Sequence, residues 1–121
     1  MKECKISLEE YGNVDVVELD GALDSYSFPK LESTLNALRD HHRHQLILNF
    51  SKLDYISSAA LGALIGFARR ARESGGDLKL AQLSDKILTI VELLGFHKVL
   101  KIHPDVQAAV EEFAGVEQGK D

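Results

Sequence analysis

The strongest constraint on the fold is an almost unbroken apolar run, Leu46-Ile47-Leu48-Asn49-Phe50, bounded by polar residues. Such runs are typical of strands that are covered on both faces, as in parallel sheets. We expect a short connection over Ser51 to Ser57 and then a helix from Ala59 to Arg72, stopped by Gly75-Gly76. The first two-thirds of this helix is apolar all round, which predicts that it is buried.

Two stretches before this run alternate between apolar and polar residues, Cys4 to Leu8 and Val14 to Leu19. A period of two residues predicts half-buried strands. Tyr11-Gly12-Asn13 lies between them and has the composition of a turn, so the two strands are expected to form an antiparallel hairpin. The next stretch, Asp20-Gly21-Ala22-Leu23-Asp24, is interpreted as a loop.

The rest of the chain predicts further helices and strands in alternation. Apolar residues at three- and four-residue spacing follow Pro29, with Ser25 or Ser27 as the candidate cap, and similar patterns follow Ser84 and Pro104. Alternating strands and helices indicate crossover units and a mainly parallel sheet. The predicted fold is α/β, with a mixed sheet of four to five strands and four helices, in one domain over 1–114 followed by a flexible tail over 115–121.

Composition narrows the possible functions. The net charge of −5 argues against nucleic-acid binding, and Cys4 is the only cysteine, which excludes an internal disulfide or a thiolate metal cage. The five histidines have no carboxylate companions at ligand spacing, and neither a Gly-x-Ser-x-Gly elbow nor a phosphate-binding glycine loop is present. The sequence thus predicts no metal, no cofactor and no enzymatic activity. Without a signal peptide or a membrane-spanning stretch, we expect a cytoplasmic protein with no membrane insertion.

The segment Ser57 to Gly62 has the chemistry of a recognition site. Its two hydroxyls, Ser57 and Ser58, fall at the expected helix start, where unsatisfied N–H groups and the helix dipole favour a negative charge. A phosphate at this position would be tolerated. The small residues Ser58, Ala59, Ala60 and Gly62 would let a partner surface approach closely. Both serines could equally serve as ordinary helix caps.

The segment from Leu53 to Gly62 resembles the signature of the anti-sigma factor antagonists, which are STAS-domain proteins. In that family an apolar pair leads into Asp-Ser-Ser-Gly-Leu-Gly. Asp20 to Asp24 is similar to the family's Gly-x-Leu-Asp loop, and Gly75-Gly76 and Leu94-Gly95-Phe96 also fit. The resemblance covers roughly the first hundred residues and implies the SpoIIAA-like form of the fold above.

In that family a cognate kinase phosphorylates the second serine of the motif. This chain departs from the motif at that position. Ser57 stands at the motif's Asp, Ser58 at its first Ser, and Ala59 at the phosphorylated Ser. Ala60 replaces the Gly, whereas Leu61 and Gly62 match. Three interpretations stay open: Ser58 or Ser57 is a shifted acceptor, the protein binds its partner constitutively, or the segment has a structural role only.

The resemblance implies a regulatory protein in a partner-switching pathway. Its partner would be an anti-sigma factor that is also a serine-protein kinase of the histidine-kinase-like ATPase type, and a phosphatase would reverse the modification. The implied contact residues are Asp20, Gly21, Leu23, Asp24, Ser57, Ser58, Ala59, Ala60, Leu61 and Gly62. The alternative is a non-switching accessory subunit of a membrane-lipid ABC transporter, which would need no acceptor serine.

Overall fold

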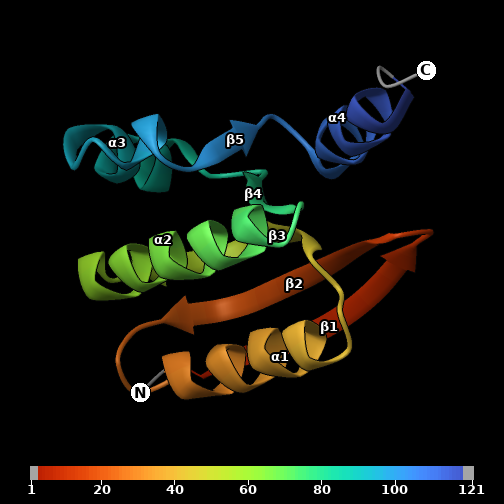
Figure 1. Cartoon of the computed structure of the whole chain (residues 1–121). Coiled ribbons are helices and arrows are strands. Elements are labelled where there is room, and N and C mark those ends of the chain that lie inside the picture. Colours follow the sequence, from red (N-terminus) through yellow and green to blue (C-terminus); the bar gives the residue numbers. More distant parts are fainter. Residues whose placement is uncertain (1–2, 119–121) are drawn as a thin grey trace.

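A computed structural model describes residues 3–118 as a single five-stranded sheet with helices on both faces (Figure 1). Its elements, in chain order, are β1 Cys4–Tyr11, β2 Val14–Leu23, α1 Phe28–Asp40, β3 Gln45–Ile56, α2 Ser58–Glu73, β4 Asp77–Ala81, α3 Asp85–Leu93, the 3₁₀ turn η1 Phe96–Lys98, β5 Lys101–His103 and α4 Val106–Gln118. The strands lie in the order β1-β2-β3-β4-β5. Only β1 and β2 pair antiparallel, so the predicted mixed, mainly parallel sheet is confirmed.

Three strands are longer than the sequence pattern predicted, and β1 reaches Tyr11, which was expected to lie in the turn. The residues taken as a loop, Asp20 to Leu23, continue β2, and those taken as a connection, Ser51 to Ile56, continue β3. The two extensions pair with each other through two register shifts, between Glu18 and Asp20 and between Gly21 and Ala22. These irregularities disrupt the alternation of apolar and polar residues. That alternation is the only signal by which the sequence could have identified a strand here.

The apolar side chains of the sheet divide between two layers. On one face, Leu46 and Leu48 of β3 belong to a large core that includes residues of α1, α2 and α3. On the other face, Ile47 packs with Val14, Val16 and Ala81 beneath Ala109 and Phe113 of α4. A strand that contributes to both cores must be apolar at consecutive positions, which explains the Leu46–Phe50 run.

The helix ends agree in part with the predicted caps. Ser57 and Ser84 precede α2 and α3, and each hydroxyl accepts a hydrogen bond from a backbone N–H in the first turn. Ser27 precedes α1 as expected, but its hydroxyl makes no capping bond to that helix. At the other end of the chain, α4 continues to Gln118, so the expected tail begins inside this helix. Residues 119–121 lie outside the described residues.

The prediction that the first part of α2 is buried is wrong for one of its faces. Ala60, Leu61, Leu64 and Phe67 are buried against the sheet, whereas Ala59 and Gly62 are exposed and Ala63 and Gly66 are half-buried. The face that is not covered carries small residues. They make the sequence of this helix look apolar, although they are not packed into the core.

Among residues 3–118, no helix combines the length and apolar character needed to cross a membrane.

A buried ion pair attaches α4 to the sheet. The ammonium of Lys79, whose side chain is 4% exposed, bonds the carboxylate of Glu112 and lies 3.6 Å from that of Asp77. It also lies 4.7 Å from the centre of the Phe113 ring. Lys79 lowers the pKa of the Glu112 carboxyl below its usual range. Because a buried ammonium needs partners, this network constrains where α4 can pack.

We expect Glu112→Gln to destabilise the protein by about 2 kcal/mol at neutral pH, since it leaves Lys79 with Asp77 as its nearest carboxylate. The pKa of Glu112 is depressed in the folded state, so its contribution is complete above the unfolded-state pKa and is lost as the pH falls through the folded-state pKa. The gap between wild type and variant should therefore close below about pH 4.5. Denaturant unfolding across pH measures this, with Glu111→Gln as the exposed control.

Candidate functional site

The candidate site lies at the edge of the sheet where the parallel strands end, on the left of Figure 1. The ends of β2 and β3 are joined there by a hydrogen bond of 2.9 Å from the N–H of Ser57 to the carbonyl of Leu23. This bond places the turn after β2 beside the start of α2. Leu23 and Asp24 therefore lie beside Ser57 at the same end of the sheet.

Ser57 organises the start of α2. Its backbone is extended, at φ −79° and ψ 155°, and its hydroxyl accepts a hydrogen bond of 3.1 Å from the N–H of Ala60. The Ser57 carbonyl accepts a second bond, from Leu61 N–H at 3.0 Å. This is the geometry of a helix cap. Of the two serines, Ser57 is half-buried and engaged in capping, while Ser58 is exposed on the first turn.

Asp24 holds the facing turn in shape. One carboxylate oxygen accepts hydrogen bonds from the N–H of Tyr26 at 2.9 Å and of Ser27 at 3.0 Å. The Ser27 hydroxyl donates to the carbonyl of Ala22 at 2.7 Å and accepts from Asp24 N–H at 3.0 Å. The hydrogen bond from Ser27 N–H is the main cause that lowers the pKa of the Asp24 carboxyl. Asp24 is thus a turn-forming carboxylate rather than a free acid or base.

The ten residues implied as contacts divide into an accessible group of five, a buried group of four, and Asp20. Ser58, Ala59 and Gly62 are exposed, and Asp24 and Ser57 are half-buried beside them. Gly21, Leu23, Ala60 and Leu61 are buried, so they shape the surface from below rather than touch a partner. Asp20 is exposed, but it lies three residues before the end of β2, where it pairs with Lys52. At the rise of a strand, this separates Asp20 from the helix start by about 10 Å.

Two exposed aromatic side chains belong to the segments that meet at this end of the sheet, and the sequence interpretation missed them. Tyr26 lies in the Asp24 turn with 70% of its surface exposed, and Tyr55 lies at the end of β3 with 47% exposed. Tyrosine is enriched where proteins dock. The signal was available, since each tyrosine stands two positions from a residue assigned to the site, Asp24 or Ser57. We call Tyr26, Tyr55, Ser58, Ala59 and Gly62 the helix-start surface.

The helix-start surface offers exposed hydroxyls, two aromatic rings and a small-residue helix face. Within residues 3–118, no group of three or more histidine, cysteine or carboxylate side chains is arranged to hold a metal ion. The chemistry at this site is that of a binding surface on an α/β domain.

The chain belongs to the STAS domain family, whose model matches residues 5–109. It is 28% identical over 109 residues to BtrV of Bordetella bronchiseptica, which is named as an anti-sigma factor antagonist; the match covers 90% of this chain and 94% of the relative. It is 25% identical over 87 residues to the anti-sigma-B factor antagonist of Staphylococcus aureus, covering 72% and 81%.

The fold is also that of solved anti-sigma factor antagonists. The structure of SpoIIAA in its unphosphorylated form superposes with a TM-score of 0.72 at 19% identity, over 92% of this chain and 99% of that one. SpoIIAA of Bacillus has also been solved in a phosphorylated form, with a TM-score of 0.69 at 18% identity, over 90% and 99%. The predicted SpoIIAA-like STAS fold is confirmed.

Proposed function

We propose that this protein is an anti-sigma factor antagonist that binds an anti-sigma factor through the helix-start surface. The observation that carries the proposal is the bond between Ser57 and Leu23, which joins the turn braced by Asp24 to the exposed start of α2. Relatives that align over most of the chain carry that functional name. By holding the anti-sigma factor, the protein would free a sigma factor for transcription.

The finer part of the proposal concerns the partner and its switch. We propose that the partner is a serine-protein kinase of the histidine-kinase-like ATPase type, countered by a phosphatase. Of the two serines, Ser58 is the better acceptor, because its side chain is exposed whereas Ser57 caps α2. A phosphate on Ser58 would lie beside the helix N-terminus, and its charge of about −1.5 to −2 would change the docking surface.

The size of the site supports transient binding. The helix-start surface occupies one end of the sheet in a chain of only 121 residues, and small interfaces are common in transient signalling complexes. We further propose that residues 1–114 act as one STAS domain, of which 5–109 match the family, and that the protein works in the cytoplasm as a binding protein without turnover.

The testing experiment is a pull-down from a lysate of the native host, with mass spectrometry of the captured proteins. Wild type, Ser58→Asp and Ser33→Asp are compared; Ser33 is an exposed serine on α1 and controls for added charge. We expect wild type and the control to capture a kinase-type anti-sigma factor, and Ser58→Asp to capture at least about tenfold less, since the new charge must be desolvated on docking.

Two outcomes would contradict the proposal. Equal capture by all three proteins would show that Ser58 is not part of the docking surface. Capture of ABC-transporter subunits in place of an anti-sigma factor would replace the regulatory function with the accessory-subunit alternative.

The melting temperature of Ser58→Asp should equal or exceed that of wild type, because an acidic residue in the first turn complements the helix dipole.

A further inference from the structure

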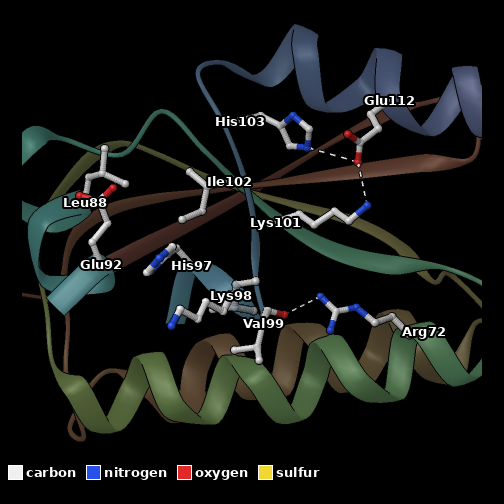
Figure 2. A pocket seen from close by; sticks show the side chains of 11 residues that line it. Arg72, Leu88, Glu92, His97, Lys98, Val99, Lys101, Ile102, His103 and Glu112 are labelled. Atoms are coloured by element: carbon white, nitrogen blue, oxygen red, sulfur yellow. Dashed lines mark hydrogen bonds and ion pairs between the residues drawn. The ribbon is translucent and has the colours of Figure 1, made fainter. Parts of the chain in front are cut away.

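A groove of about 780 Å³ runs along β5 (Figure 2). Residues from five elements line it, namely the end of α2, α3, η1, β5 and α4. None of the residues of the helix-start surface lines this groove. We call it the β5 groove and define it by Arg72, Leu88, Lys98, Val99, Lys101 and Ile102.

The groove follows an open sheet edge. Among residues 3–118, β5 is the last strand of the sheet and pairs only with β4. The carbonyl of His103 accepts a hydrogen bond from Gln82 N–H at 3.3 Å, so His103 directs its backbone groups to β4. Because successive strand residues direct their N–H and C=O groups to opposite sides, Ile102 directs its own to the open edge. An extended chain can pair with such an edge.

The floor of the groove is apolar. Leu88 of α3 and Ile102 of β5 line it and are half-buried, so part of each side chain remains uncovered. Val99, just before β5, is 37% exposed. Figure 2 shows these three side chains around the same opening, with Lys98 next to Val99. Such a floor can take one or two apolar side chains of a ligand.

The rim of the groove is cationic on a chain whose net charge is −5. Three cations line it: Arg72, which is already paired with Asp77 at 2.8 Å, and the exposed Lys98 and Lys101, the latter with 61% of its side chain exposed. One of the two lining carboxylates, Glu112, is already engaged by Lys79 and lies 3.7 Å from Lys101 and 3.5 Å from His103 Nε2. Glu92 is the other lining carboxylate.

We propose that the β5 groove docks an extended acidic segment of a protein partner. The segment pairs its backbone with Ile102, places an apolar side chain against Leu88 and Val99, and directs carboxylates to Lys98 and Lys101. A second copy of this chain fits less well, because a two-fold contact between two such grooves would bring their cationic rims together. This inference does not depend on the function proposed for the helix-start surface.

The test uses a fluorescein-labelled peptide, Glu-Glu-Leu-Glu-Val-Glu-Glu, and the full chain. Fluorescence anisotropy gives the affinity, and amide shifts in NMR spectra locate the contact. We expect the largest shifts at Leu88, Val99 and Ile102. The variant with Lys98→Glu and Lys101→Gln should bind about tenfold more weakly, and so should wild type tested with a peptide whose glutamates are glutamines.

A matched control carries Lys86→Glu and Lys5→Gln, two exposed lysines outside the groove. It has the same net charge as the groove variant and should bind the peptide within about twofold of wild type. If both variants bound the peptide equally weakly, the loss of affinity would be due to overall charge, and the proposal would be overturned. Shifts centred on Ser58, Ala59 and Gly62 would overturn it by placing the peptide on the helix-start surface. Sedimentation that shows a dimer abolished by the groove variant would assign the groove to a second copy instead.

Discussion

Replacing Gly21 by alanine is expected to destabilise the protein by about 3 kcal/mol, and so to lower its melting temperature by on the order of 10 °C. Gly21 has a φ of +124°, which side-chain-bearing residues rarely adopt, and an added Cβ would overlap the backbone carbonyl of Glu3. Both penalties arise at the point where the β2–β3 pairing shifts register. Thermal and denaturant unfolding of the variant measure the effect.

Gly62→Ala is the matched control, because Gly62 was also assigned to the docking surface. It lies within α2, and an added Cβ would meet no atom within 4 Å. Alanine should therefore raise the free energy of unfolding by up to about 1 kcal/mol. If Gly62→Ala proved as destabilising as Gly21→Ala, the distinction between a buried shaping glycine and an exposed contact glycine would be wrong.

Replacing Ala59 by serine is expected to create a phosphate acceptor where the family motif has one. Ala59 is exposed in the first turn of α2, so a serine hydroxyl there would be accessible to a kinase. Incubated with ATP and the kinase recovered in the pull-down, the variant should gain one phosphate at this position. Since the added charge lies in the docking surface, affinity for that partner should then fall by at least about tenfold. Intact-mass spectrometry and calorimetric titration measure the two steps.

Ala63→Ser supplies the control for this experiment, because Ala63 lies on the same helix one turn later and is half-buried. It should gain no phosphate. Phosphorylation of Ala59→Ser at Ser58 and not at residue 59, with the same site modified in wild type, would establish Ser58 as a shifted acceptor. Absence of phosphate on every serine of both proteins would favour constitutive binding, and the kinase part of the proposal would then be wrong.

The helix-start surface and the β5 groove differ in chemistry. The first presents small residues, hydroxyls and two tyrosines, and the second presents lysines over an apolar floor beside a strand edge. Only α2 contributes to both, with Ser58, Ala59 and Gly62 near its start and Arg72 about ten residues later, roughly 15 Å along the helix. A partner could therefore occupy one surface without covering the other. Variants at Lys98 and Ser58 therefore allow the two proposals to be tested independently.

Several features of the fold could be predicted from local sequence alone. The two alternating stretches before and after Tyr11-Gly12-Asn13 predicted the hairpin, and the Leu46–Phe50 run predicted a strand covered on both faces. Ser57, together with Ser58, and Ser84 stood at expected helix starts, and Ser57 and Ser84 are caps. This could be predicted because a cap depends on only three or four consecutive residues. The resemblance of the segment around Ser57 to the STAS signature could also be seen in the sequence, because the signature is a run of consecutive residues.

Other features depended on contacts between residues distant in the sequence. The extensions of β2 and β3 pair residues about 30 positions apart, and a register shift at Gly21 removes the alternation that would reveal them. The burial of Lys79 could not be predicted from its neighbours in the sequence, because its partner Glu112 is 33 positions away, in α4. Within one short motif, Leu61 faces the core and Ala59 faces solvent. The sequence alone determined which elements form and in what order, because those follow from local periodicity and capping. Only the tertiary structure decided which side of each element is covered, because burial depends on what the rest of the chain packs against it.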